Sequence, residues 1–269
     1  MGIQLKDLLV KKEIDINYLK GKTVAVDAYN IMYQFLSSIR QYDGTPLMDS
    51  EGNITSHLSG LFYRNINFLE TGILPVYVFD GKPPEFKITT LEGRKERKIA
   101  AKEKMRIALK KGSFAEARKY AQQVSRLTDE MIKEGKELLL AMGIPVIQAP
   151  SEGEAQASWM AKENVVYGVV SQDIDSLLFG APRLIRNLSV TGKRKMLGQN
   201  RYVSISPEII ELEIMLKGLG ITQEQLIWMG ILIGTDFNNG VRGVGPKTAL
   251  KIVKEHNHLN SIIKYIEKK

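Results

Sequence analysis

Residues 24–30, VAVDAYN, join an apolar run to an acidic residue, Asp27, at the point where a helical pattern begins. A valine-rich run that ends at an acidic residue is typical of a strand buried on both faces. The pattern predicts a strand over residues 23 to 27 and a helix over about 28 to 40, which is the opening of a βαβ unit. We therefore expect an α/β fold with a mostly parallel central sheet flanked by helices.

The alternation of strand and helix signals continues along the chain. A helix is expected at about 56 to 71, and further strands at 75 to 79, 144 to 147 and 165 to 171. A hairpin is expected over about 183 to 204, with helices from there to the end.

Acidic residues recur where the apolar runs stop. They occupy seven positions: Asp27, Asp80, Glu152, Glu154, Asp173, Asp175 and Asp236. Because the carboxyl ends of neighbouring parallel strands open onto one crevice, we expect these carboxylates to converge. Like charges at close range raise one another's pKa values unless protons or cations offset them. Oxygen ligands in a chain with no cysteine and only three histidines favour Mg²⁺ or Mn²⁺ over zinc.

Each carboxylate taken singly also has a structural explanation. The alternatives are an N-cap at Asp27, a turn at Asp80-Gly81, a capping box from Ser151 to Glu154, and a cap at Asp175 for a short helix at 176–179. A helix needs only one N-capping residue, whereas these acids come in two pairs, Glu152 with Glu154 and Asp173 with Asp175. The doubling favours a metal site for the set as a whole.

The charge balance indicates a polyanionic partner. Lysine and arginine number 38 against 30 aspartate and glutamate, which gives a net charge of +8 and an isoelectric point near 9.4. The sequence has no disulfide framework, no signal peptide and no run of about 18 apolar residues that a membrane span needs. We therefore expect a soluble, cytoplasmic protein that does not enter a membrane.

Much of the basic excess lies in one segment. Residues 94–111 carry nine lysines and arginines against two glutamates, a surplus of seven. The alternative is an exposed helix face, but such a face usually pairs lysine with glutamate at i,i+4. The imbalance favours a surface that contacts phosphates.

A second phosphate-binding signal lies in residues 240–250, GVRGVGPKTAL. Gly243 and Gly245 suit a tight turn, Pro246 suits the first position of a helix, and a helix over about 222 to 234 supplies a partner. An ordinary turn between helices is the alternative. A helix-hairpin-helix of this kind offers backbone N–H groups to a phosphate and holds the nucleic-acid backbone without reading its sequence.

Together these motifs resemble those of the flap endonucleases, the structure-specific 5′ nucleases of replication and repair, and most of all an archaeal member. The likeness runs from Met1 to about Ile263 and includes MGIQ, VAVDAYNIMYQFLSSIRQ, TSHLSGLFYR, PVYVFDGKPPE, APSEGEAQA, SQDIDSLLFG, GTDFN and GVRGVGPKTALK in the family's order. It implies a Mg²⁺-dependent enzyme that cuts 5′ flaps from branched DNA and also acts as a 5′–3′ exonuclease. We expect one nuclease domain over 1–269, made of an N-terminal part (1–86), a helical arch (87–135), an internal part (136–217) and a helix-hairpin-helix part (218–269).

The resemblance also implies roles for individual residues. One metal ion would be held by Asp27, Asp80, Glu152 and Glu154, and a second, roughly 4 Å away, by Asp173, Asp175 and Asp236. Lys87 and Arg94 would stabilise negative charge at the scissile phosphate. The residues expected to contact DNA are Gly2, Tyr33, Arg40, Arg242, Gly243, Gly245, Lys247 and Lys251.

Cofactors and partners follow from the same resemblance. It implies two Mg²⁺ ions, for which Mn²⁺ can substitute, and a monovalent cation at the hairpin. A sliding clamp is the expected protein partner, although the family's docking tail is not found before Lys269. Two other functions are left open by the residues: a related acidic-site single-strand ribonuclease, and a non-catalytic DNA-binding module whose acids serve only as caps.

Overall fold

The computed structural model describes residues 5, 8–41, 44–113, 116, 119–121, 124, 126–188, 192–195 and 202–268. The strands are β1 (Lys12–Glu13), β2 (Thr23–Asp27), β3 (Leu74–Phe79), β4 (Val146–Gln148), β5 (Gly168–Val170), β6 (Arg183–Arg186), β7 (Gly192–Lys195), β8 (Tyr202–Ile205) and β9 (Glu208–Glu211). The helices are η2 (Ile16–Leu19), α1 (Ala28–Ser38), α2 (Ser56–Thr71), η3 (Glu85–Lys87), α3 (Ile88–Lys110), α5 (Asp129–Ala141), α6 (Gly153–Lys162), α7 (Asp175–Leu178), α8 (Leu212–Leu219), α9 (Gln223–Ile233), α10 (Pro246–Glu255) and α11 (Leu259–Glu267).

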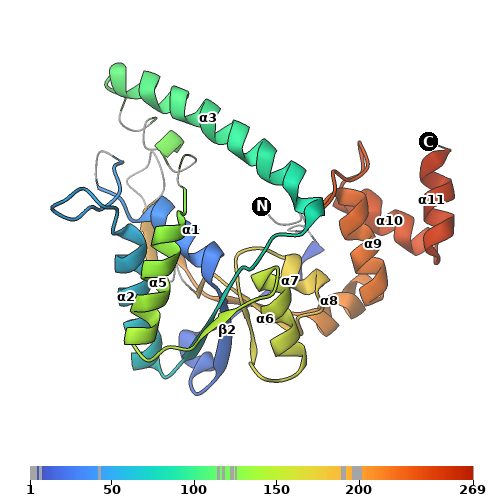
Figure 1. Ribbon diagram of the computed structural model, residues 1–269. Helices are drawn as coiled ribbons and strands as arrows, with labels where there is room; N and C mark the ends of the chain where they lie inside the picture. The colour runs from blue at the N-terminus through green and yellow to red at the C-terminus, as the bar shows by residue number, and fades with distance from the viewer. Residues whose placement is uncertain are drawn as a thin grey trace.

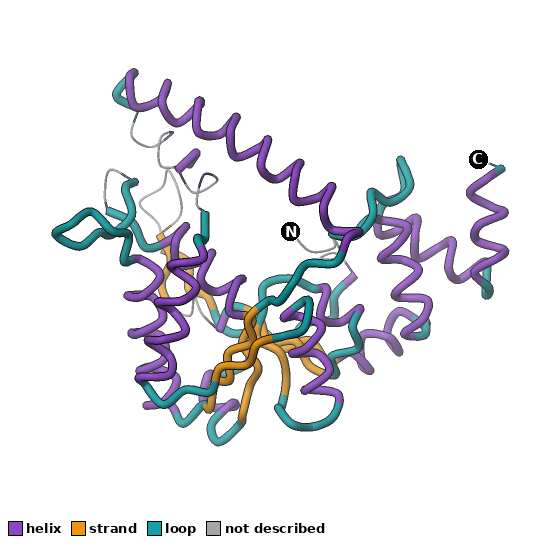
Figure 2. Tube along the Cα trace, in the orientation of Figure 1, coloured by secondary structure: helices purple, strands orange, loops and turns teal. Residues whose placement is uncertain are grey.

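A seven-stranded sheet with the order β1-β9-β6-β5-β2-β3-β4 forms the centre of the molecule (Figure 2). The strands from β6 to β4 are parallel, whereas β9 runs antiparallel to β6 and β1 antiparallel to β9. Because β2 lies between β3 and β5, the order of the chain reverses beside it. Ligands of open α/β sheets bind at the carboxyl ends of strands next to such a reversal. The predicted α/β fold is confirmed.

Successive side chains of β2 enter two cores on opposite faces of the sheet. Val24 and Val26 pack with residues of α1, α2 and α5, whereas Ala25 packs with residues of α6. Figure 1 shows these two groups of helices on the two sides of the sheet. All three side chains are fully buried, which is why the strand is an uninterrupted apolar run in the sequence.

A third core attaches the C-terminal helices to the antiparallel edge of the sheet. Leu184 of β6 and Ile210 of β9 pack there with residues of α7 to α11, among them Leu226 and Ile252. This core places α9 next to α7, whose first residue is one of the predicted metal ligands, Asp175, and α10 packs on α9.

Helix α3 stands apart from these layers. It has 23 residues and, at 1.5 Å per residue, is about 34 Å long. Figure 1 shows it as a long bridge above the sheet, from the region of α7 and α9 to the region above α1 and α2. Lys102, Lys104 and Arg106 are exposed on it, as expected for a basic arch. The end of the segment predicted as the arch is different, because residues 129–135 lie in α5, which packs on α2.

Two predicted elements need correction. The residues at 183–186 form β6 of the main sheet, and the hairpin is restricted to β7 and β8. Residues 208–211, expected to be helical, form β9, since the two isoleucines of Glu208-Ile-Ile-Glu211 enter cores on opposite faces and so favour a strand. The predicted helix at 56–71 and strand at 23–27 are confirmed. No helix in the described part of the chain is long and apolar enough to cross a membrane.

Candidate active site

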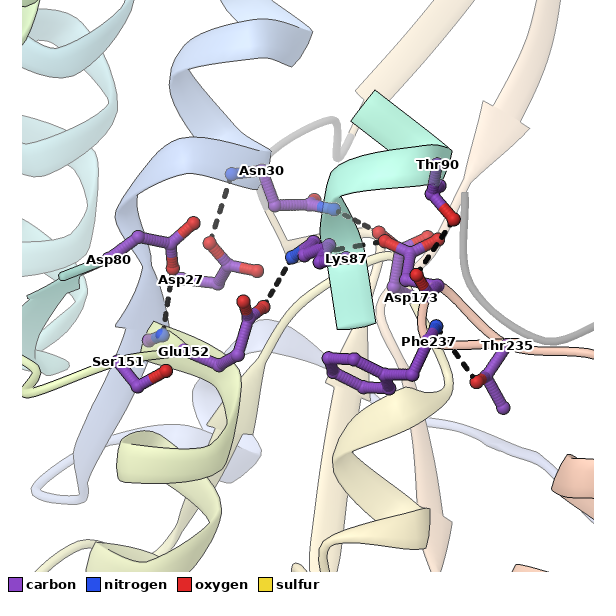
Figure 3. Close-up of polar contacts among 12 residues, drawn as sticks. Asp27, Asn30, Asp80, Lys87, Thr90, Ser151, Glu152, Asp173, Thr235 and Phe237 are labelled. Carbon is purple, nitrogen blue, oxygen red and sulfur yellow. Dashed lines mark hydrogen bonds and ion pairs between the residues drawn. The ribbon is translucent and has the colours of Figure 1, made fainter. Parts of the chain in front are cut away.

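Six of the seven predicted carboxylates lie at or just beyond the carboxyl ends of four adjacent parallel strands. Asp27 ends β2, Asp80 follows β3, Glu152 and Glu154 follow β4, and Asp173 and Asp175 follow β5. The seventh, Asp236, comes from the loop after α9. Figure 3 shows Asp27, Asp80, Glu152 and Asp173 around the ammonium group of Lys87. The expected convergence is therefore seen among side chains from separate elements.

Three of these carboxylates accept hydrogen bonds from backbone amides of the helical segments that begin at the sheet edge. Asp27 Oδ1 accepts from the amide of Asn30 at 3.0 Å, and Asp80 Oδ1 accepts from that of Gly153 at 2.7 Å. Glu154 Oε1 accepts from the amide of Ser176 at 3.2 Å. Each amide bond uses one oxygen of the carboxylate, and the second oxygen takes no part in that bond. Capping and metal binding are therefore compatible roles for the same residue.

Of the capping roles considered as alternatives, one is present in the structure and two are not. Asp27 is the N-cap of α1, as its position allowed. The capping box at Ser151 is not formed, since its hydroxyl donates to the carbonyl oxygen of Lys82 at 3.1 Å and the N-cap of α6 is Glu152. Asp175 is the first residue of α7 and follows its N-cap, Ile174.

Burial and neighbouring negative charges raise the pKa values of buried carboxylates in this cluster. Burial, and then the charges of Asp80 and Asp173, raise the pKa of Asp27 to about 7. Burial also raises the pKa of Glu154, with further contributions from Asp27, Asp175 and Asp173. The two predicted ligand groups are thus close enough to interact electrostatically, and the cluster carries more negative charge than its buried setting favours.

Lys87 supplies positive charge to this cluster. Its ammonium group donates to Glu152 Oε2 and lies 3.9 Å from Asp236 Oδ2. Burial opposes the charge of Lys87, but the neighbouring carboxylates outweigh it and hold its pKa above the ordinary value. Lys87 is therefore placed between acids of both predicted groups.

The donor set fits hard divalent cations, because its groups are carboxylate oxygens crowded at one edge of the sheet. Among the described residues, no three His, Asp or Glu side chains are already spaced to hold one ion. The ammonium group of Lys87 is bonded to Glu152 Oε2. It has to move away before a metal ion can bind that oxygen.

Residues that the motifs did not single out hold the acidic side chains and their loops in place. Asn30 donates from Nδ2 to Asp173 Oδ2 at 3.1 Å, and Thr90 donates to the carbonyl oxygen of Asp236 at 2.8 Å. Gln148 Nε2 donates to the carbonyl oxygen of Asp80 at 2.7 Å. Asn30 stands within the same motif as Asp27, but its residue type alone gave no signal. These contacts connect distant segments and are not encoded in local spacing.

The loop that carries Asp236 has its own internal bonds. Thr235 Oγ1 donates to Asn238 Oδ1 at 2.9 Å and accepts from the amide of Phe237 at 3.1 Å. Asn238 Nδ2 reaches back to the carbonyl oxygen of Ile231 in α9 at 2.7 Å. The GTDFN sequence is thus a compact turn that fixes the position of Asp236.

The helix-hairpin-helix geometry is present between α9 and α10. Gly243 has a φ of +80°, a conformation that favours glycine, and Gly245 is the N-cap that precedes Pro246 at the start of α10. Arg242 and Lys247 are exposed, and Lys251 Nζ lies 3.7 Å from Glu255 Oε1. The hairpin therefore presents basic side chains beside a helix N-terminus.

The other predicted DNA contacts are scattered. Tyr33 is 37 % exposed on α1. Arg40 donates to the carbonyl oxygens of Gly44 at 2.7 Å and Ala121 at 3.1 Å, so it joins the segment after α1 to residue 121, which lies between α3 and α5 in the chain. Gly2 and the side chain of Arg94 lie outside the described residues, although the backbone of Arg94 belongs to α3.

Comparison with known proteins agrees with this geometry. The XPG N-terminal domain family matches residues 1–101, and the XPG I-region family matches residues 143–236. Flap endonuclease 1 of Pyrococcus horikoshii is 60% identical over 255 residues, which cover 94% of this chain and 74% of the relative. That of Saccharolobus solfataricus is 55% identical, covering 98% and 77%.

The chain belongs to the flap endonuclease family.

Solved structures support the assignment. A flap endonuclease-1 from Methanococcus jannaschii has a TM-score of 0.76 and 46% identity, covering 100% of this chain and 80% of that one. The catalytic core of Rad2 in complex with DNA substrate has a TM-score of 0.69 and 30% identity, covering 95% and 67%. This flap endonuclease is a structure-specific 5′ nuclease that binds DNA and hydrolyses its phosphodiester bonds, and its family depends on divalent metal ions.

Proposed function

We propose that this flap endonuclease cuts the 5′ flap with two divalent metal ions, Mg²⁺ or in its place Mn²⁺, held by the seven carboxylates. Asp27, Asp80, Glu152 and Glu154 form one ligand group, and Asp173, Asp175 and Asp236 form the other. The observation that carries the proposal is the convergence of these carboxylates at one edge of the sheet, where burial raises the pKa values of Asp27 and Glu154. The charge of Asp173, from the other group, raises both values further, which marks a surplus of negative charge. When bound, two such ions activate a water and stabilise the leaving oxygen of an in-line displacement.

The basic residues bind the scissile phosphate in this proposal. Lys87 has to leave Glu152, and its ammonium group then stabilises negative charge on the phosphate. Arg94 lies seven positions further along, in α3, and is proposed to do the same from the arch. Thr90 anchors the first turn of α3 to the Asp236 loop, so the arch and the ligands keep a fixed relation.

Residues outside the catalytic cluster position the DNA. The hairpin between α9 and α10 binds duplex backbone through Arg242, Gly243, Gly245, Lys247 and Lys251, with a monovalent cation at the turn. Tyr33 stacks on a base, Arg40 contacts the DNA near the duplex junction, and Gly2 contacts it close to the active site. The four-part division of the chain, 5′–3′ exonuclease activity, roles in replication and repair, and binding of a sliding clamp complete the proposal.

An end-labelled 5′-flap duplex and a pseudo-Y substrate, assayed with Mg²⁺ and with EDTA, test the reaction. We expect Asp175→Asn to abolish cleavage while flap binding is kept, and Glu163→Gln, an exposed acid at the end of α6, to cleave normally. An Asp175→Asn enzyme that cuts at the wild-type rate would refute the ligand assignment. Single-stranded RNA is assayed alongside these DNA substrates. Preferential cutting of the RNA would favour a ribonuclease instead.

A further inference from the structure

We propose that Asn30 is a positioning residue that sets the distance between the two carboxylate groups, an inference that rests on the proposed two-metal site. Asn30 is the third residue of α1 and makes three hydrogen bonds at the site. Its backbone amide donates to Asp27 Oδ1 at 3.0 Å, its Nδ2 donates to Asp173 Oδ2 at 3.1 Å, and its Oδ1 accepts from the amide of Gln172 at 3.2 Å. Figure 3 shows the side chain reaching from α1 to Asp173.

The need for such a residue follows from where the sheet ends. The pairing of β2 with β5 stops at Val26 and Val170, one residue before Asp27 and three before Asp173. Beyond that pair the two segments diverge, one into α1 and the other into the loop before α7. Asn30 links them again through side-chain bonds, so its carboxamide continues the connection between the strands past the last backbone pair.

Ser171 makes a second link at the same place. Its hydroxyl lies 3.4 Å from Asp27 Oδ2 and accepts from the amide of Asp173 at 3.2 Å. The contact to Asp27 is longer than an ordinary O–H···O hydrogen bond of about 2.5–3.0 Å, so the shorter bonds of Asn30 carry more of the connection. Asp27 and Asp173 are thus joined by two short side chains, one from each segment.

A carboxamide suits this position for a chemical reason. It presents a donor to a carboxylate and an acceptor to a backbone amide at the same time, and it adds no charge to an already crowded cluster. Aspartate would replace the donor with a further negative oxygen beside Asp173. Alanine and leucine would remove both bonds but keep the backbone amide that caps Asp27, so they separate the two contributions of Asn30.

Metal binding is the property that such a residue controls. Two ions that share a phosphate lie about 3.5–4 Å apart, so their ligand groups need a defined separation. Groups that orient metal ligands typically contribute about 10- to 100-fold to metal affinity or activity. We therefore expect loss of the Asn30 side chain to weaken metal binding by about tenfold or more.

The test measures Mn²⁺ binding to the full chain by isothermal titration, with Mn²⁺ alone as the probe and no DNA. Asn30→Ala and the volume-conserving Asn30→Leu are expected to bind Mn²⁺ about tenfold more weakly than wild type. Their Mg²⁺ concentration for half-maximal flap cleavage should rise by a similar factor, with the KM for flap DNA unchanged. Asn67→Ala, an exposed asparagine of α2, is the matched control and should behave as wild type.

Three outcomes would count against the inference, and they are distinguishable. If wild type binds Mn²⁺ and cuts the flap but both Asn30 variants match it, Asn30 does not position the ligands. If wild type itself neither binds Mn²⁺ nor cuts, the proposed two-metal function fails and the inference fails with it. Thermal unfolding in EDTA identifies a variant that is merely unfolded, and a loss of affinity equal to its unfolded fraction also counts against the proposal.

Discussion

The hydroxyl group of Thr90 donates a 2.8 Å hydrogen bond to the backbone carbonyl oxygen of Asp236, and so fastens the base of the long helix α3 to the loop that carries a metal-ligand candidate. The bond joins two segments that are 146 residues apart in the chain. The position of the first turn of α3 is therefore linked to that of Asp236.

Thr90→Val removes this bond while keeping the shape of the side chain. A single hydrogen bond contributes about 0.5–1.5 kcal/mol, so we expect single-turnover flap cleavage to slow by about 2- to 10-fold. Flap binding should be unchanged and Thr90→Ser should restore the rate. Thr71→Val is the control, since its hydroxyl donates to Asn67 at the exposed end of α2. Equal rates for the two valine variants would argue against the coupling.

Lys87→Met tests the competition between the ammonium group and metal ions. Without DNA, the lysine is bonded to Glu152 and close to Asp236. We expect the variant to bind Mn²⁺ more tightly than wild type in direct titration, yet to cleave flaps about 100-fold more slowly because charge stabilisation at the phosphate is lost. Lys162→Met, at an exposed position of α6, controls for the loss of a positive charge. Weaker Mn²⁺ binding by Lys87→Met would contradict this interpretation.

Asp27→Asn tests the electrostatic cost of the site. The pKa of Asp27 is raised to about 7. Between about pH 4 and pH 7, this carboxyl group therefore holds a proton in the metal-free folded protein but has released it in the unfolded chain. The stabilising contribution of this group is present at low pH and is lost as pH rises through about 7. Asparagine keeps an oxygen for the amide of Asn30 but has no charge.

We therefore expect Asp27→Asn in EDTA to have a higher Tm than wild type at pH 8. The difference should shrink as the pH falls and vanish near pH 4, about the ordinary pKa of an aspartate. Scanning calorimetry across this range makes the measurement, with Glu163→Gln as the exposed control. A lower Tm for Asp27→Asn at pH 8 would show that the charge is better compensated than its surroundings indicate.

Gly60→Ala tests the packing that holds α1 in place. A Cβ atom at Gly60 would lie 2.2 Å from Cγ of Phe35, so α1 and α2 would have to separate. Overpacking of this kind costs about 1–3 kcal/mol, measurable by urea unfolding. Gly93→Ala is a close control, because it also lies in a helix but its Cβ would meet no atom within 4 Å. We expect that control to be neutral or slightly stabilising.

Lys247→Ala and Lys251→Ala test the hairpin as a phosphate-binding element. Each lysine that contacts a phosphate releases about one counterion, so the slope of log affinity against log salt should fall by about 0.9 per residue for duplex DNA. Lys217→Ala, at an exposed position of α8 that pairs with Glu213, should leave the slope unchanged. The same slope for all three variants would place the hairpin away from the DNA backbone.

The sequence pattern predicted the parts of the fold that depend on local periodicity. β2 and α2 have the predicted bounds because a short valine-rich run favours a strand and a 16-residue amphipathic run favours a helix. β9 was missed because four residues, two of them acidic, carry too short a pattern, and its strand pairing comes from β6 and β1. Pairing between distant segments is a tertiary property.

The candidate site divides in the same way. Strand ends predicted that the acids gather, but not that Asp27 would cap α1 and face the cluster at once. The bond from Lys87 to Glu152 and that from Asn30 to Asp173 each join separate elements, and residue type alone does not select such partners. The proposed roles of individual ligands and DNA contacts remain predictions for the experiments above.

The amide bonds to Asp27, Asp80 and Glu154 have an evolutionary consequence. The same side chains that organise the helix starts also concentrate negative charge, so a neutral replacement that keeps the amide contact can stabilise the metal-free fold. A laboratory selection for heat resistance alone, without a requirement for cleavage, would therefore be expected to discard these acids early. Their presence together is what we expect where catalysis is selected at the expense of the stability of the metal-free fold.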